Sequence, residues 1–183
     1  MIKKTFFILC SVIIAFSALA ENPLHLKSGS LRELKRCGKS ISCHFDFSGT
    51  RANRKSLNEY LVNDYQSSRK EFDNNVPTMI KWFSDRWDDD IDDGPRYTSN
   101  PNAPYHMEVV IRTLQLGTKS RFGGSSISGY VYFYYNGDEI PFAEVEILKL
   151  EGTQFKVPLP GYEGLYQVFN DLAEYLCDLI FKS

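Results

Sequence analysis

The residues of this chain that could perform acid–base chemistry are few and far apart in the sequence. The three histidines are His25, His44 and His106, and a histidine acts as a general base only when a nucleophile lies within hydrogen-bond reach. His44 falls on the polar side of one expected strand and His106 at the start of another. These two would meet only if the strands are neighbours. No pair of base and nucleophile is visible, so we assign no catalytic residue.

The serine-rich segment 124–128 does not match a hydrolase nucleophile. It contains Gly124 and Ser126 but has Ser128 where the second glycine of Gly-x-Ser-x-Gly belongs. A hydrolase whose groups converge from distant segments, with His44 and His106 among them, is the alternative function.

The densest group of carboxylates runs from Asp88 to Asp93. Carboxylate oxygens bind calcium, but the helix–loop–helix calcium site needs a glycine at position six and a glutamate at position twelve. With Asp88 as the first position, these places hold Asp93 and Ser99. We interpret the run as a solvated acidic segment after a helix and expect no metal. Zinc is not expected either, because the chain has no Cys-x-x-Cys pair.

The strongest candidate for binding is a row of tyrosines within 126–135. Side chains alternate along a strand, so Tyr130, Tyr132 and Tyr134 share one face, about 7 Å apart, opposite Val131 and Phe133. If helices cover the Val131 side, the tyrosines form a flat amphipathic row suited to sugar rings or to a protein partner. The alternative is that tyrosine, a good strand former, only covers the back of the sheet.

The first twenty residues predict export. Lys3 and Lys4 precede an apolar segment over 6–16, and Ala18-Leu19-Ala20 is typical of a cleavage site. The apolar segment is shorter than the roughly 20 residues that cross a bilayer. We therefore expect residues 1–20 to be a signal peptide and the mature protein to be periplasmic or secreted, with no membrane insertion after cleavage.

The remaining residues, 21–183, have the size and composition of a single domain. The whole chain is 43% hydrophobic and 14% aromatic, which is typical of folded globular proteins. The leader carries two of the 21 basic residues and none of the 23 acidic residues, so its removal changes the formal charge from −2 to −4. This balance argues against nucleic acid and anionic membranes as partners.

Cysteines remain at positions 37, 43 and 177 after cleavage. In an oxidising compartment one disulfide and one free thiol are expected, and the sequence does not decide among the three pairings of Cys37, Cys43 and Cys177. The alternative is that Cys43 and Cys177 are small buried apolar residues.

The elements that would position these groups follow from periodicity and capping. Capping boxes predict a short helix over 31–37 and a longer one over 57–72, and Pro77 starts another over about 77–89. Strands are expected over 41–47, 105–116, 126–135 and 139–150, and a last helix follows Pro160-Gly161 and runs almost to the end.

The turn at Asn136-Gly137 would pair Tyr135 with Asp138 and Val131 with Phe142.

The element order predicts an α+β fold, a two-layer sandwich in which a mainly antiparallel sheet of about four strands has helices on one face.

Several short motifs follow one another in a fixed order after the leader. They are Leu34-Lys35, Phe45-Asp46-Phe47-Ser48, the tryptophans Trp82 and Trp87, the segment Asn100-Pro101-Asn102-Ala103-Pro104-Tyr105, and a C-terminal helix. In this order the chain resembles small exported proteins of unknown function from Bacteroidetes. It departs from them in its cysteines and at Leu159-Pro160-Gly161-Tyr162, which stands in place of a charged run. The resemblance implies an exported α+β domain and no particular reaction, ligand or cofactor.

These observations favour an exported, non-enzymatic module of the cell envelope that binds a protein or a glycan through Tyr130, Tyr132 and Tyr134. No cofactor is expected. A structural component of an envelope assembly is a further alternative, and it would present a large apolar surface patch.

Overall fold

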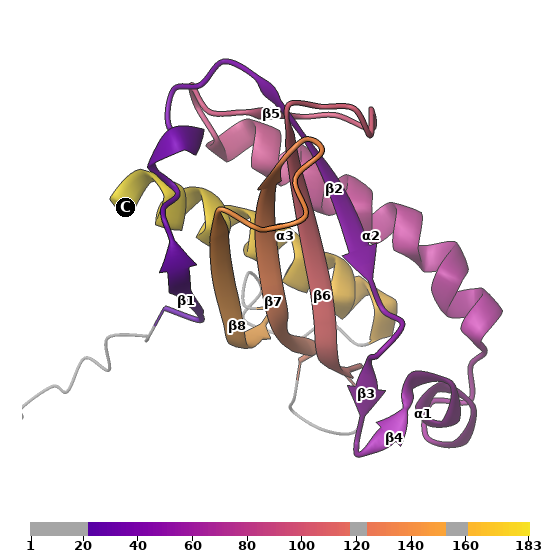
Figure 1. Cartoon of the computed structure of the whole chain (residues 1–183). Helices are drawn as coiled ribbons and strands as arrows, with labels where there is room; N and C mark the ends of the chain where they lie inside the picture. The colour runs from indigo at the N-terminus through magenta and orange to yellow at the C-terminus, as the bar shows by residue number, and fades with distance from the viewer. Residues whose placement is uncertain (1–21, 118–123, 153–160) are drawn as a thin grey trace, which may run out of the picture.

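The computed structural model describes residues 22–117, 124–152 and 161–183, and the expected signal peptide lies outside these residues. Its centre is an eight-stranded sheet with two long helices on one face (Figure 1). The strands are β1 (Leu24–Gly29), β2 (Ser40–Asp46), β3 (Arg51–Ala52), β4 (Lys55–Ser56), β5 (Arg96–Tyr97), β6 (Tyr105–Gln115), β7 (Ser126–Tyr135) and β8 (Ala143–Glu151). The helices are the 3₁₀ turn η1 (Arg32–Leu34), α1 (Leu57–Asn63), α2 (Arg69–Asp90) and α3 (Gly161–Lys182).

The sheet is mixed, with the order β1-β8-β7-β6-β2-β5. β1, β8, β7 and β6 pair antiparallel, whereas β2 is parallel to both β6 and β5. β3 pairs with β6 and with β4. The chain is α+β, but the expected sheet of about four, mainly antiparallel strands is wrong.

Two physical reasons explain this error. β3, β4 and β5 have two residues each, too few to show any periodicity in the sequence. β2 and β6 are separated by α1 and α2, and a connection through helices is how a chain returns to add a parallel strand. β1, which forms one edge of the sheet, was also not expected from the sequence.

The Asn136-Gly137 turn forms, but the expected register of its hairpin is wrong. Gly137 has a φ of 89°, as the turn requires. β8 nevertheless starts only at Ala143, and Val131 pairs with Val145 instead of Phe142.

The phase of the apolar residues in β8 explains this register. Pro141 has no N–H to give to a ladder, and Ile140 is 80% exposed. In the observed register Val145 and Ile147 both point to the buried face. Burial of apolar side chains therefore outweighs the pairing that a two-residue turn would impose.

The helix expected over 57–72 is two helices. The capping box at its start is confirmed, because the Ser56 and Glu59 side chains each accept a hydrogen bond from the other residue's backbone N–H. α1 ends at Asn63, and Gln66 has a φ of 52°, which interrupts the helix. The Ser68 side chain then accepts a hydrogen bond from Glu71 N and begins α2.

The other two helix starts also differ from expectation. Pro77 lies inside α2 instead of at its first turn, although it removes one helix hydrogen bond. The apolar stripe of α2 continues through this point, with Phe72 and Met79 both fully buried, and this packing holds the helix together. The helix expected over 31–37 is only the η1 turn, whose Leu31 cap makes no side-chain hydrogen bond.

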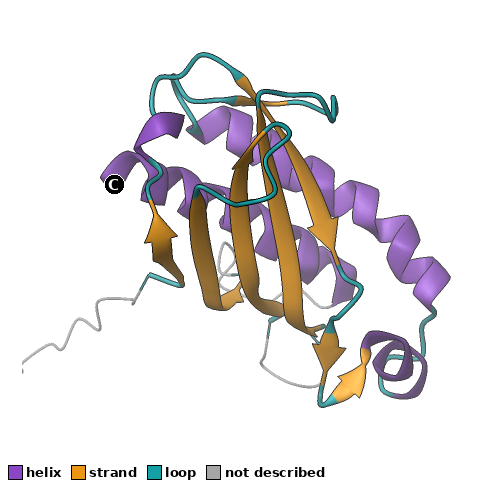
Figure 2. Cartoon of the chain, in the orientation of Figure 1, coloured by secondary structure: helices purple, strands orange, loops and turns teal. Residues whose placement is uncertain are grey.

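The main core lies between the sheet and the helices α2 and α3. Figure 2 shows these two helices together behind the long strands, with α1 beside the short strands β3 and β4. Phe45 of β2 links the layers, with its ring centroid 5.3 Å from Phe83 of α2 and 5.1 Å from Phe169 of α3. Among the described residues, no helix is both long and apolar enough to cross a membrane.

Candidate functional site

The face of the sheet opposite α2 and α3 carries the tyrosine row. Tyr130, Tyr132 and Tyr134 are half-buried there, whereas Val131 and Phe133 between them are fully buried on the helix side. The strands β6, β7 and β8 have no helix in front of this face (Figure 1). We call it the open face. The alternation expected along β7 therefore places the three tyrosines as the sequence indicated.

Aromatic rings on the open face lie close to one another. The rings of Tyr130 and Tyr132 have centroids 6.1 Å apart and planes inclined by 24°. The His106 ring lies 6.1 Å from that of Tyr134. Tyr134 also donates a hydrogen bond to Glu108 Oε2 at 3.4 Å. The row is thus a connected surface that continues from β7 onto β6.

Carboxylates flank the tyrosines on both neighbouring strands. Tyr132 is paired with Glu144 of β8 on one side and with Glu108 of β6 on the other. Burial, and after it the charge of Glu144, raises the pKa of Tyr132. Burial, and after it the charge of Glu108, raises the pKa of Tyr134. Both phenols therefore stay neutral at physiological pH and remain hydrogen-bond donors.

Two of the three histidines meet on this face because β2 and β6 are neighbours. Ser42 is paired with His106, and His44 with Glu108. Ser42 Oγ lies 3.0 Å from His106 Nδ1. Burial lowers the pKa of His106, and the nearby Glu108 charge opposes that change.

This serine–histidine pair is not an accessible nucleophile. Ser42 is only 5% exposed, and its Oγ also lies 3.5 Å from the carbonyl oxygen of Tyr105. His25 lies on the edge strand β1, where it is paired with Glu146 of β8, away from the pair on β2 and β6.

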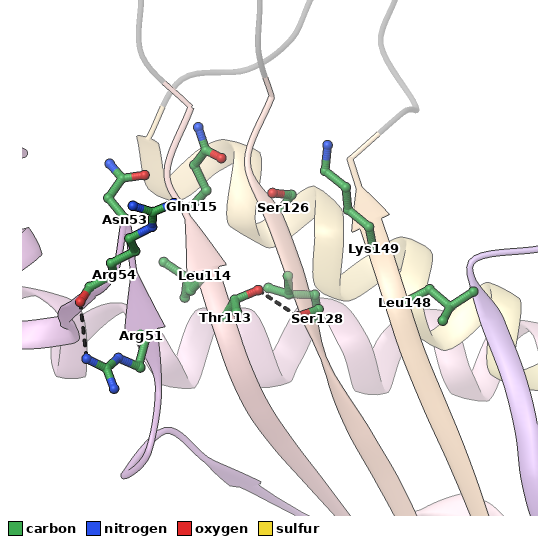
Figure 3. A pocket seen from close by; sticks show the side chains of 11 residues that line it. Arg51, Asn53, Arg54, Thr113, Leu114, Gln115, Ser126, Ser128, Leu148 and Lys149 are labelled. Carbon is green, nitrogen blue, oxygen red and sulfur yellow. Dashed lines mark hydrogen bonds between the residues drawn. The ribbon is translucent and has the colours of Figure 1, made fainter.

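One end of the open face forms a pocket of about 640 Å³. The pocket lies where the strand pairing is irregular: Arg112 of β6 is an extra residue opposite β7, and Leu148 and Lys149 of β8 lie together opposite Ser128. Such bulges bend strands and redirect side chains. Figure 3 shows the lining side chains, which are Arg51, Asn53, Arg54, Thr113, Leu114, Gln115, Ser126, Ile127, Ser128, Leu148 and Lys149.

Sequence reasoning missed this pocket. Its basic side chains Arg51 and Arg54 come from the β3–β4 hairpin, whose turn residues Asn53 and Arg54 have φ values of 49° and 66°. A two-residue turn of this kind usually contains glycine, and that signal is absent here. The only available sign was Asn53, a residue that tolerates positive φ.

The acidic run has a structural role at the end of α2. Asp88 Oδ1 accepts a hydrogen bond from the backbone N–H of Tyr97 at 2.7 Å. The Arg96 guanidinium donates to the backbone carbonyls of Asp88 and Asp92. These contacts hold β5 against α2. Within the three described ranges, no group of three or more His, Cys, Asp or Glu side chains is arranged to hold a metal ion.

The cysteines Cys37, Cys43 and Cys177 are free thiols in the structure. Cys177 is 1% exposed on α3 and Cys43 points to the helix side of β2. Burial raises the pKa of both thiols. These two side chains pack as small apolar residues, which was one of the two alternatives from the sequence.

The sequence matches no protein-family model, and it is not significantly similar to any curated protein. Two solved structures match the chain at low identity. One is a PelC dodecamer from Paraburkholderia phytofirmans, 10% identical, with a TM-score of 0.44 over 85% of this chain and 95% of that chain. The other is a single-residue variant of the same dodecamer, 11% identical, with a TM-score of 0.43 over the same shares. At these values the likeness supports no conclusion about this chain.

Proposed function

We propose that this protein is an exported, non-enzymatic binding module of the cell envelope and that its open face binds a glycan. The observation that carries the proposal is the alternation of Tyr130, Tyr132 and Tyr134 with the carboxylates Glu108 and Glu144 across three adjacent strands. Aromatic rings offer apolar faces to the C–H faces of sugars, and phenol and carboxylate oxygens bind sugar hydroxyls. The expected leader supports a periplasmic or secreted location.

A glycan explains the composition of this face better than a protein partner does. The central part of a protein interface is depleted in glutamate and aspartate, because their desolvation is costly. Here Glu108, Glu144 and Glu146 lie among the tyrosines and are half-buried. A sugar leaves such carboxylates partly hydrated and pairs them with hydroxyl groups.

A glycan array with the purified mature protein tests the proposal. We expect the wild type to retain a defined set of glycans. Tyr132→Ala should bind these glycans with an affinity about tenfold lower, because one well-packed aromatic contact is lost. Tyr135→Ala is the matched control, because Tyr135 lies on the same strand but points to the opposite side. Equal retention by Tyr132→Ala and wild type, or no glycan bound by the wild type, would contradict the proposal.

A hydrolase is the second candidate, and the hydrogen bond between Ser42 and His106 is the observation that favours it. Because Ser42 is only 5% exposed, this activity would require a movement that opens the site to substrate. A panel of chromogenic esters and glycosides tests this alternative. Turnover by the wild type that disappears in Ser42→Ala and in His106→Gln would support it. Turnover that survives both changes would exclude this pair as its source.

A structural role in an envelope assembly has less support. Among the described residues, the large apolar side chains that are exposed are few and come from α1, the β7–β8 hairpin, β8 and α3. They are Val62, Tyr135, Ile140, Leu148 and Phe181.

A further inference from the structure

We propose that the pocket at the bulged end of the open face binds an anionic group, and that the ligand is therefore an acidic glycan. The second part of this inference rests on the proposed glycan function, while the first stands on the pocket alone. Sugar rings would contact the tyrosine row, and a carboxylate or phosphate group of the same chain would enter the pocket.

The charge of the lining is the main argument. Arg51, Arg54 and Lys149 contribute three cations to the pocket, and none of its eleven lining residues is acidic. This concentration stands out in a chain whose formal net charge is −2. Like charges gathered around a concave surface raise the local concentration of counter-ions, so the pocket attracts anions.

The two arginines have donors available for such a group. Arg51 Nη2 donates a hydrogen bond to the backbone carbonyl of Arg54 at 3.2 Å. The other guanidinium N–H groups of Arg51 can then donate to a ligand. Within the described residues, neither Arg51 nor Arg54 has an ion pair within 4 Å, whereas Lys149 is paired with Glu151. Arginine forks bind carboxylate and phosphate oxygens in pairs, which gives the site its preference for these groups.

Hydroxyl groups complete the lining. Thr113 and Ser128 lie side by side across β6 and β7, with their hydroxyl oxygens 2.6 Å apart. In Figure 3 this pair lies between Arg51 on one side and Lys149 on the other. The pocket thus combines charge with neutral donors, as sites for oxyanions commonly do.

The pocket and the tyrosine row belong to one surface. Ser128 of the pocket and Tyr130 and Tyr132 of the row follow one another on β7 with the same orientation. Ser128 and Tyr132 are four positions apart along the strand, which corresponds to roughly 13 Å. Arg112, the extra residue of β6, is exposed. Burial raises the pKa of Tyr132, and the charge of Arg112 opposes that change. A single extended ligand can therefore contact both regions.

Titration calorimetry with matched probes tests the inference. The probes are oligogalacturonate, its neutral methyl ester of the same length, and inorganic phosphate. We expect the wild type to bind oligogalacturonate about tenfold more tightly than the methyl ester at low salt, and less so at high salt, because an exposed ion pair is screened. Arg54→Ala should abolish this preference. Arg54→Gly is a second variant whose backbone accepts the positive φ of the turn, and it should do the same.

Arg32→Ala is the control for the loss of one positive charge. Arg32 is exposed in η1, before β2, and does not line the pocket. This variant should keep the wild-type preference. If Arg54→Ala and Arg54→Gly behave like Arg32→Ala with every acidic probe, the anion site is refuted.

The remaining outcomes separate this inference from the proposed function. Equal binding of the acid and the ester, with Tyr132→Ala weakening both, keeps the glycan function and refutes the anion site. Phosphate that binds the wild type but not Arg54→Ala, with neither oligosaccharide bound, supports the anion site and refutes the glycan part of both proposals.

Discussion

The two faces of β7 differ sharply although they are made by alternate residues of one strand. On the side of α2 and α3, Val131 and Phe133 are fully buried. On the open face, Tyr130, Tyr132 and Tyr134 are only half-buried and lie among carboxylates. The helix side has the composition of a protein core, and the open face has the composition of a surface that contacts polar molecules.

This difference separates residues that maintain the fold from residues whose identity the fold does not require. Burial against the helices explains the apolar residues of β7 completely. It does not require three tyrosines on a solvent-facing side, where threonine and other β-branched residues also form strands. Substitutions on the two faces should therefore have different consequences, which the following predictions test in order of expected size.

The largest effect is expected for Phe133→Ala. Removing this buried ring should lower the free energy of unfolding by about 3–5 kcal/mol, because a cavity remains in a packed core. Tyr132→Ala, one residue away on the open face, should cost no more than about 1 kcal/mol. Urea denaturation of both variants measures the difference. Similar losses for the two substitutions would remove the distinction between the faces.

Gly129→Ala should damage both faces at once. A Cβ atom at this position would lie 2.0 Å from the backbone oxygen of Val110, so the β6–β7 pairing must shift. We expect a loss of about 1–3 kcal/mol, the usual cost of overpacking, together with weaker binding because the adjacent Tyr130 moves. Thermal unfolding and glycan titration check the two parts. Wild-type values in both would show that the strands approach less closely than described.

The reactivity of the cysteine thiols measures how easily a reagent reaches the side of the sheet that the helices cover. Cys177 is 1% exposed, and burial raises its pKa, whereas Cys37 is half-buried. In reduced, folded protein at pH 8 we expect iodoacetamide to label Cys37 at least tenfold faster than Cys177, because only the thiolate of an accessible cysteine reacts. Mass spectrometry of the peptides measures this ratio. Equal rates would mean that α3 opens readily.

The smallest effect concerns the pH dependence of the open face. Burial holds the pKa of His106 below its ordinary value of 6.5, so the folded protein binds fewer protons there than the unfolded chain. Stability from this group is complete above about pH 6.5 and falls as the pH decreases through the lower folded value. Urea midpoints at pH 7.5 and 5.5 should show a smaller difference in His106→Gln than in wild type. An unchanged difference would contradict this role of His106.

Local patterns predicted the long strands β2, β6 and β7 but not the extent of α2 or the register of β8. The alternation along β2, β6 and β7 and the Ser56 capping box are present in the structure as the sequence indicated. These features depend on residues close in the chain, and a single sequence shows them directly.

Features that depend on distant contacts could not be predicted in the same way. The parallel pairing of β2 with β6, which brings Ser42 to His106, is decided by where the two intervening helices pack. The basic pocket combines a two-residue strand with bulges in β6 and β8, and none of these has a sequence signal of useful length. The candidate tyrosines were therefore accessible to sequence reasoning, and Arg51 and Arg54 were not.

At Arg54, the residue that would give the most stable backbone differs from the residue that would bind an anion. The φ of 66° at Arg54 belongs to a region that side chains with a Cβ enter at a cost, and glycine there would relieve that strain. Laboratory selection of random variants for heat resistance alone should thus enrich glycine at this position. Selection for capture of an acidic ligand should retain arginine, so sequencing the survivors of both regimes would reveal which demand shaped the hairpin.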